Sequence, residues 1–194
     1  MLNFFHKLFG PTKPGVRRLP PKPKLILTNA CVDAVRSGLA SEIQKEHEGI
    51  VFLLGRTDGV VTLAVGVFRP KANTTSGSFH VPAAAMAQCI EAAASLDLQV
   101  VGQIHTHPGQ AYHSDGDVEG TRIRYAGFAS VVAPNYGRNL PNLSGVAAYL
   151  WRESGSWHQL TASDVVVLQG AGPWIAKSGS TNGTAGRSGT AIVV

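Results

Sequence analysis

The sequence predicts an α+β fold in which helices flank a mixed β-sheet. Segments with the three- and four-residue apolar spacing of helices alternate with short β-branched segments, several of which are joined by hairpin turns. The length of 194 residues and an apolar fraction of 44% suit one globular domain with tails. Every apolar run is shorter than the roughly 18 residues that a membrane-spanning helix needs, so no transmembrane segment is expected.

The chain divides into a central domain, residues 25–169, and two tails of different composition. Residues 1–24 are rich in proline and basic side chains and contain no acidic residue. This composition favours a solvated, extended linker; the alternative is contact with an acidic partner, nucleic acid or an anionic membrane surface. Residues 25–194 carry 11 basic and 12 acidic residues, so nucleic-acid binding is not expected. Residues 170–194 form a second tail, rich in Gly, Ser and Thr.

The first half of the domain shows two helical and four strand patterns. Apolar residues recur every three or four positions after Asn29, which would cap the first helix, and Asp58-Gly59 is a strong hairpin-turn signal. The second helix is alanine-rich, with its apolar side formed by Met86, Cys89, Ile90, Ala93 and Leu96. From residue 24 to residue 96 we expect, in order, strand 24–28, helix 29–45, strands 48–55 and 60–68, polar loop 69–78, strand 79–81 and helix 82–96.

The second half repeats this alternation of strands and helices. Two tryptophan-containing segments near the end of the domain are expected to form a hairpin through residues 153–156. From residue 99 to residue 169 we expect, in order, strand 99–107, helix 114–126, strand 129–133, loop 134–142, strands 146–151 and 157–160, and a last short strand or terminal element over 164–169.

One segment combines residues that suit a catalytic metal ion. His105 and His107 are two apart at the end of a predicted strand, so both point to one side of it. Pro108 stops the strand, Ser114 is a candidate helix cap, and Asp117 would face back from the first helical turn. Zinc binds imidazole nitrogen and carboxylate oxygen, and catalytic sites use three such ligands with one position open for water.

The Ser114-x-x-Asp117 pattern and the pair of histidines each have a simpler interpretation as well. The Ser114-x-x-Asp117 pattern is also a capping box, which satisfies free amides at a helix start. A His-x-His pair on an exposed strand is commonly a surface feature. The combination favours a metal site, because a cap does not require two histidines on one face of the preceding strand, and a capping serine can still present its hydroxyl to the site.

The pattern His105-x-His107-Pro108 followed by Ser114-x-x-Asp117, with a glutamate upstream of Leu53-Leu54-Gly55, resembles the JAMM (MPN+, JAB-domain) metalloproteases over residues 25–165. The resemblance implies a curved mixed sheet flanked by helices, of the cytidine-deaminase-like αβ-sandwich type. It also implies zinc-dependent hydrolysis of peptide or isopeptide bonds, commonly at the C-terminus of ubiquitin or a ubiquitin-like protein, for deconjugation or precursor processing.

The resemblance also assigns roles by position. His105, His107 and Asp117 would bind one Zn²⁺ together with a water molecule, and Ser114 would donate a hydrogen bond to the oxyanion. A glutamate outside the metal shell would be the general base. Glu46 and Glu48 are both candidates. The family pattern places Leu-Leu-Gly seven residues after the base, which selects Glu48, whereas a count from the glycine at 49 selects Glu46; we expect Glu48.

Two features depart from common family patterns. His113 stands before the serine, where a proline is often found, and is expected to be a solvent-side loop residue. Segments 69–78 and 134–142 are short, although ubiquitin-chain-specific members carry insertions there. The chain therefore resembles compact bacterial members, which act on ubiquitin-like proteins beside E1-like and E2-like partners, in some cases in antiviral defence.

Two other functions are compatible with the sequence: a non-catalytic MPN-type protein-binding module, and a processing protease for a sulfur-carrier-like protein. Cys31 and Cys89 lack CxxC spacing and are expected to be buried thiols in a reducing compartment. Residues 1–10 form a short amphipathic stretch without the features of a signal peptide. A cytoplasmic location is therefore expected, and no particular oligomeric state is predicted.

Overall fold

The computed structural model describes residues 22–170 of the chain, and these residues build a curled sheet with helices on both sides. The strands are β1 (Leu25–Thr28), β2 (Ile50–Thr57), β3 (Thr62–Phe68), β4 (Asn73–Thr75), β5 (Ser78–His80), β6 (Gln99–Thr106), β7 (Ala129–Ala133), β8 (Ala147–Trp151), β9 (Trp157–Gln159) and β10 (Val165–Leu168). The helices are α1 (Asn29–Gly38), α2 (Ala40–Lys45), α3 (Ala83–Ser95) and α4 (Asp115–Gly120), with short 3-10 turns η2 (Asn135–Gly137) and η3 (Ala162–Asp164).

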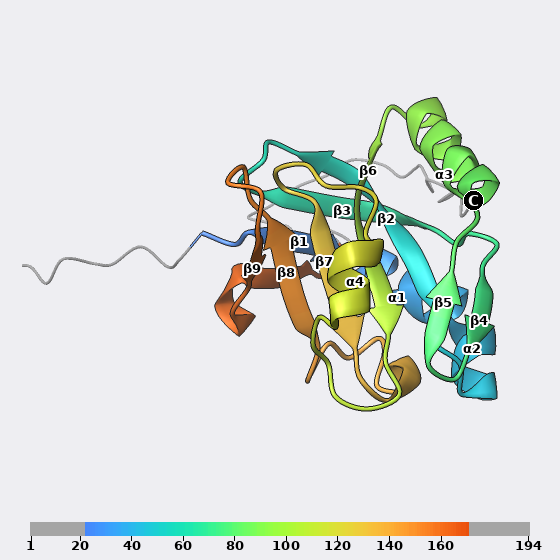
Figure 1. Cartoon of the computed structure of the whole chain (residues 1–194). Helices are drawn as coiled ribbons and strands as arrows, with labels where there is room; N and C mark the ends of the chain where they lie inside the picture. The colour runs from blue at the N-terminus through green and yellow to red at the C-terminus, as the bar shows by residue number, and fades with distance from the viewer. Residues whose placement is uncertain (1–21, 171–194) are drawn as a thin grey trace, which may run out of the picture.

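Eight strands form the main sheet, in the order β10-β1-β3-β2-β6-β7-β8-β9, and β4 pairs with β5 in a separate hairpin (Figure 1). Neighbouring strands are parallel in the pairs β10–β1, β1–β3 and β6–β7, and antiparallel in the others. The α+β class and the curved mixed sheet that the sequence predicts are thus confirmed.

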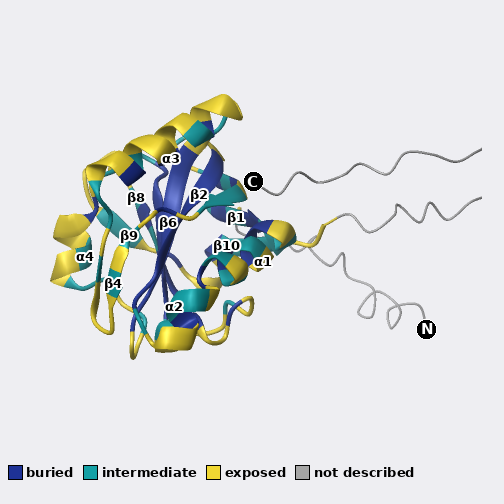
Figure 2. Ribbon diagram, turned by 90° about the vertical axis from the view of Figure 1, so that its right-hand side faces the viewer, coloured by how far each residue is buried: buried dark blue, intermediate teal, exposed yellow. Residues whose placement is uncertain are grey.

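Apolar side chains form two clusters, one on each face of the sheet. Figure 2 shows that the central strands are buried. On one face, α1 and α2 pack against β1, β2 and β6 through residues such as Val35 and Ile43. On the other face, Cys89 and Ala93 of α3 pack with Phe52 and Phe128. Burying a large apolar side chain contributes roughly 1.5–3 kcal/mol, so these two clusters hold the sheet that carries the site.

Strands β2 and β6 form the centre of the sheet, and β7 lies unusually close to β6. A Cβ atom on Gly102 of β6 would lie 2.6 Å from the carbonyl oxygen of Ala129 on β7, so only glycine fits there without a backbone shift. The same pairing continues to the end of β6, where His105 lies opposite Val132. The end of β6 is therefore fixed by a neighbour on each side.

The predicted helix over 29–45 is instead two helices. Leu39 interrupts it with φ −96° and ψ 0°, after Gly38, a poor helix former, and its side chain is buried. Asn29 does not cap α1: the Oγ1 atom of Thr28 accepts the hydrogen bond from the backbone N–H of Cys31 at 3.1 Å. The burial of Leu39 is a tertiary effect that overrides the regular apolar spacing.

The helix predicted over 114–126 is also shorter, because α4 ends at Gly120. The hydroxyl of Thr121 turns back and donates to the carbonyl of Asp117 at 2.7 Å. Farther along, the hydroxyl of Tyr125 donates to the carbonyl of Val100 at 2.8 Å, which holds this irregular segment against the sheet. One local and one long-range hydrogen bond thus replace the last helical turn.

Two further predictions need correction. The segment 69–78 is not only a loop, because it contains β4, which pairs with β5. Helix α3 buries Ala85, Cys89 and Ala93, whereas Ile90 and Leu96, expected on its apolar side, are about half exposed. Small residues form the buried side because α3 lies close to the sheet.

The two cysteines are buried, as the sequence predicts, and both are free thiols. Burial raises the pKa of each thiol to about 12, so neither is a reactive nucleophile at neutral pH. No helix among residues 22–170 is long and apolar enough to cross a membrane. The predicted tails fall almost wholly outside the described residues.

Candidate metal centre

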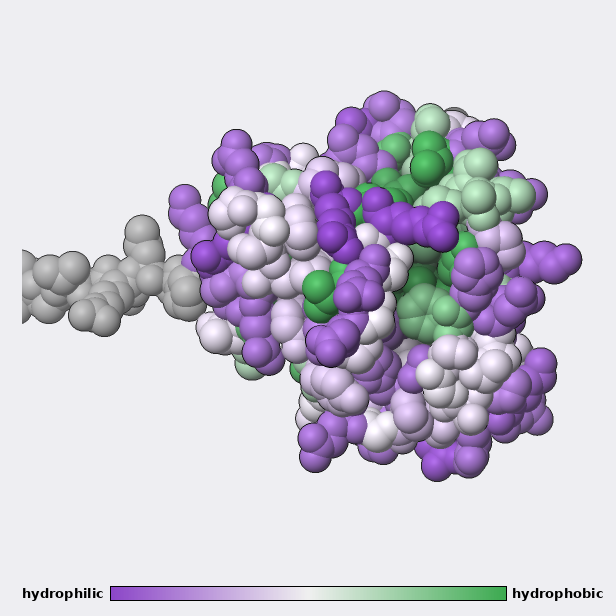
Figure 3. All heavy atoms as spheres, viewed as in Figure 1, coloured by the Kyte–Doolittle hydropathy of each residue, from purple (hydrophilic) through white to green (hydrophobic). Residues whose placement is uncertain are grey.

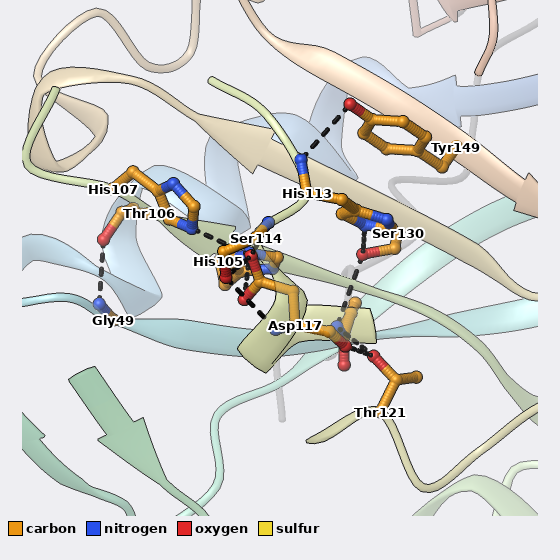
Figure 4. Close-up of polar contacts among 11 residues, drawn as sticks. Gly49, His105, Thr106, His107, His113, Ser114, Asp117, Thr121, Ser130 and Tyr149 are labelled. Atoms are coloured by element: carbon orange, nitrogen blue, oxygen red, sulfur yellow. Dashed lines mark hydrogen bonds and ion pairs between the residues drawn. The ribbon is translucent and has the colours of Figure 1, made fainter. Parts of the chain in front are cut away.

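Strand β6 carries the two histidines to one edge of the sheet. His105 is fully buried and lies opposite Ile50 of β2, while His107 follows directly after the strand. Between them, Thr106 is bound to Gly49 twice: its N–H donates to the Gly49 carbonyl at 3.0 Å, and its Oγ1 accepts from the Gly49 N–H at 2.8 Å. These two hydrogen bonds fix Thr106, the residue between the two histidines, at the end of β6 (Figure 4).

The carboxylate of Asp117 lies between the two imidazole rings. Its Oδ1 is 3.1 Å from His105 Nε2, and its Oδ2 is 3.2 Å from His107 Nε2. The candidate ligand atoms of the three residues all lie within 4.8 Å of one another. The structure therefore brings together the three residues that the sequence predicted as metal ligands.

The donor atoms of this cluster fit a divalent metal ion. Among the described residues, neither ring nitrogen of the buried His105 has a hydrogen-bond partner, and the orientation of Nε2 toward Asp117 is not that of a hydrogen bond. Buried polar atoms without partners are rare, and they commonly mark an ion or a reactive site. Two imidazole nitrogens and one carboxylate are also a ligand set of catalytic zinc sites.

The neighbouring imidazoles favour the ionised form of the Asp117 carboxylate. Burial by itself would raise the pKa of Asp117, but the imidazoles of His105 and His107 outweigh it and hold the pKa well below the ordinary value. The hydrogen-bonding contact with Asp117 raises the pKa of His107. Asp117 is therefore ionised at neutral pH, and a metal ion binding here would favour the unprotonated form of the His107 ring nitrogen that it contacts.

Ser114 and Asp117 form the predicted capping box of α4. The Asp117 N–H donates to Ser114 Oγ at 3.2 Å, while Asp117 Oδ2 accepts from the Ser114 N–H at 2.8 Å and from its hydroxyl at 2.7 Å. The capping interpretation is confirmed, and it is compatible with the metal interpretation, because the cap holds the Asp117 carboxylate toward the histidines. The Ser114 hydroxyl must turn away from Asp117 before it can donate to a substrate.

Glu48, and not Glu46, lies at the site. Glu48 is only 8% exposed and lines the same cleft as His107, Ser114 and Asp117. Burial raises its pKa, and the nearby His107 partly offsets this. Glu46 has a left-handed backbone conformation (φ 55°), is exposed, and forms an ion pair with Arg138, the residue that follows η2.

The cleft beside the cluster has a volume of about 880 Å³. Figure 3 shows it as an apolar recess between α4 and the β4–β5 hairpin. The residues that line this cleft include Phe52, Phe79, Met86, Thr121 and Ile123. The β4–β5 hairpin beside the cleft was not predicted from the sequence; the signal for it is the turn Ser76-Gly77 between two short runs of β-forming residues.

His113 is not the solvent-side residue that the sequence suggested. Its ring stacks on Tyr149 of β8, with centroids 3.8 Å apart and planes at 14°, and its edge meets Trp157 of β9. Its Nε2 is 2.9 Å from Ser130 Oγ on β7. The flat face of Tyr149 provides a site for an aromatic ring that local sequence could not reveal.

Comparison with known proteins identifies a related sequence and related folds. The probable metalloprotease y4jG of Sinorhizobium fredii is 30% identical over 141 residues, which are 71% of this chain and 87% of that protein. Protein DSY2949 of Desulfitobacterium hafniense matches 75% of this chain and 93% of its own, with a TM-score of 0.56 and 14% identity. A Salinibacter ruber protein matches 73% of this chain and 90% of its own, with a TM-score of 0.51 and 23% identity. The two structures support the fold alone, and no protein-family model matches the chain.

Proposed function

Because this chain belongs to the same family as the probable metalloprotease y4jG, we propose that it is a zinc-dependent peptidase of the JAMM type. Its proposed substrates are peptide or isopeptide bonds at the C-terminus of a ubiquitin-like protein. The observation that carries the proposal is the convergence of His105, His107 and Asp117, from two different elements, beside a buried glutamate in one cleft.

Each residue of the cluster has a chemical task in this proposal. His105, His107 and Asp117 would hold the Zn²⁺ ion, which when bound supplies a Lewis acid and a water molecule that is acidic near neutral pH. Glu48 takes a proton from the attacking water and gives it to the leaving amine. Its raised pKa suits this task, because a general base works best with a pKa near the working pH. Ser114 donates a hydrogen bond to the substrate carbonyl oxygen as that oxygen becomes negative.

The cleft supports an extended polypeptide as substrate. Strand β5 is paired on one side with β4, and its residues 78–80 line the cleft. A peptide segment can add to such a strand edge through main-chain hydrogen bonds, with side-chain specificity supplied by pockets. The apolar wall formed by Phe79 and Met86 would receive the substrate side chains near the scissile bond. E1-like and E2-like proteins are the proposed partners that deliver such conjugates.

The test compares Glu48→Gln with Glu46→Gln in the full chain loaded with Zn²⁺. The substrates are a ubiquitin-like domain with a C-terminal extension, the same domain linked to a lysine side chain, a sulfur-carrier-like domain with an extension, and a short peptide. We expect Glu48→Gln to lower kcat/KM by about 10²- to 10⁴-fold while it still binds one metal ion. Glu46→Gln should resemble the wild type.

The outcomes distinguish the parts of this proposal. Unchanged cleavage by Glu48→Gln would exclude that residue as the base. Cleavage of the sulfur-carrier-like fusion or of the short peptide alone would overturn the proposed substrate class and leave the peptidase. A wild-type protein that binds these domains but cleaves none would be a binding module instead.

A further inference from the structure

The short helix α4 carries two residues of the metal centre but has almost no apolar packing of its own. It spans six residues, and none of them is buried. A helix this short is unstable in isolation, because nucleation costs more than a single turn recovers. Contacts at its two ends must therefore determine where Asp117 and Ser114 lie relative to the histidines of β6.

Three side chains that lie in one row across the sheet hold the segment that leads into the N-terminal end of α4. Gln103 of β6 lies opposite Ser130 of β7, which lies opposite Tyr149 of β8. The Gln103 Nε2 donates to Ser130 Oγ at 3.3 Å, so the row is joined across two strands. It lies on the same face as His105, because Gln103 and His105 are two residues apart on β6.

His113 connects this row to the residue that caps α4. Its side chain is bound at Ser130 and stacked on Tyr149, and its backbone N–H donates to the Tyr149 hydroxyl at 3.2 Å. The next residue in the chain is Ser114. The backbone at His113 is thus fixed at two points immediately before the capping box begins (Figure 4).

The other end of α4 reaches the same row. Gln103 Nε2 also lies 3.5 Å from Thr121 Oγ1, a weak contact, and the Thr121 hydroxyl donates to the Asp117 carbonyl. His113 is the stronger of the two connections, since it combines a 2.9 Å polar contact with an aromatic stack.

We propose that His113 is a positioning residue: by binding the Gln103–Ser130–Tyr149 row, it places Ser114 and Asp117 for metal binding and for the reaction. This inference rests on the proposed metal site. His113 does not contact substrate; it acts through the capping box. A proline at this position would fix the backbone but could not reach the row, so this chain uses a side-chain connection instead.

The test uses variants that separate stacking from the polar contact. His113→Phe keeps a ring for Tyr149 but loses the contact with Ser130, whereas His113→Gln keeps a polar group for Ser130. We expect His113→Phe to bind Zn²⁺ about 10- to 100-fold more weakly, as measured by competition with a chromogenic chelator, and His113→Gln to recover much of this loss. In turnover, the decrease should appear in kcat rather than in KM.

A second pair of measurements excludes a general loss of stability. Thr28→Ala, which removes the cap of α1 on the far face, should lower the melting temperature without weakening metal binding. The double variant His113→Phe/Ser130→Ala should lose less metal affinity than the sum of the two single losses, because both changes break the His113–Ser130 contact, while Ser130→Ala also removes the hydrogen bond from Gln103. Additive losses, or an equal loss in Thr28→Ala, would overturn the proposal.

Amide hydrogen exchange in the metal-free protein tests the positioning role apart from the proposed function. In His113→Phe we expect faster exchange at the N–H groups of Val118 and Thr121, which are bound to Ser114 and Asp117 carbonyls, and no change in β6. If the wild type binds no metal, the proposed function fails, but this measurement still decides whether His113 holds α4. Unchanged exchange in α4 would refute that role.

Discussion

The two halves of the candidate metal centre are held in place by different forces. His105 lies on a central strand whose residues from Val100 onward are buried and which is paired on both sides. Asp117 lies on a six-residue helix with no buried residue, held by a capping box and by polar contacts of the flanking His113 and Thr121 with the sheet. The strand half is therefore formed by folding itself, whereas the position of the helix half depends on a few hydrogen bonds and on the ion.

This difference assigns separate effects to the two halves. Damage to the strand should appear as lost stability of the whole domain, because apolar packing is shared across the sheet. Damage to the helix should appear as lost metal affinity and turnover with little loss of stability, because α4 contributes little apolar burial.

The largest effect is expected from Asp117→Asn, on the helix half. An amide is a poor metal ligand beside two imidazoles, so the metal should be lost and with it several kcal/mol of transition-state stabilisation, about a thousandfold or more in kcat/KM. Metal content after dialysis and cleavage of the best substrate are the measurements. An Asn variant that keeps one ion and wild-type turnover would contradict the assigned ligand set.

Ser114→Ala should have the next largest effect. Removing an oxyanion donor lowers turnover by about 10²- to 10³-fold, and removing the cap lowers stability by about 1 kcal/mol. Ser114→Thr keeps a hydroxyl and a good capping residue, so it is the matched control. Steady-state kinetics and urea denaturation of both variants measure the two effects. A kcat for Ser114→Ala equal to that of the wild type would leave Ser114 with the capping role alone.

Gly102→Ala tests the strand half. The added methyl group would meet the Ala129 carbonyl oxygen, so β6 and β7 must separate, at a cost of about 1–3 kcal/mol. The denaturation midpoint should fall, while metal affinity per folded molecule changes little. A large loss of metal affinity without a stability loss would show that the strand end is not preformed.

The smallest effect is expected far from the site, at the β2–β3 turn. Asp58 Oδ1 accepts hydrogen bonds from the N–H groups of Val60 and Val61, at 2.9 and 2.7 Å. The hydrogen bond from Val61, followed by the one from Val60, holds the pKa of the Asp58 carboxyl below its ordinary value. Its contribution to stability is therefore present above the unfolded carboxyl pKa of 3.8 and is lost as pH falls through the lower folded value. Asp58→Ala should melt slightly below the wild type at pH 7 and at the same temperature as the wild type at strongly acidic pH. The metal affinity of the site should be unchanged. A lasting difference in melting temperature in strong acid would mean that another interaction is lost.

The strand half was the easier half to predict from sequence. The two-residue period of a strand places His105 and His107 on one side whatever surrounds them, and Pro108 ends the strand. The capping box likewise follows from local spacing. These rules depend on neighbouring residues alone, and the structure agrees with them.

The parts that sequence did not predict are those set by distant residues. His113 is turned inward by Tyr149, 36 positions farther along the chain. Helix α4 is shortened in part by the hydrogen bond of Tyr125 with Val100, 25 positions earlier in the chain. The β4–β5 hairpin is different, because the turn Ser76-Gly77 that joins its strands is a local signal. The choice of Glu48 over Glu46 needed a count from Gly55, whereas in the structure burial alone separates them.

Anomalous X-ray diffraction at the zinc edge, from crystals of the full chain grown with Zn²⁺, would locate the ion relative to the three proposed ligands. We expect one strong peak about 2.0–2.2 Å from His105 Nε2, His107 Nε2 and an Asp117 carboxylate oxygen. A peak at another group of residues, or none here at full zinc saturation, would contradict this ligand assignment.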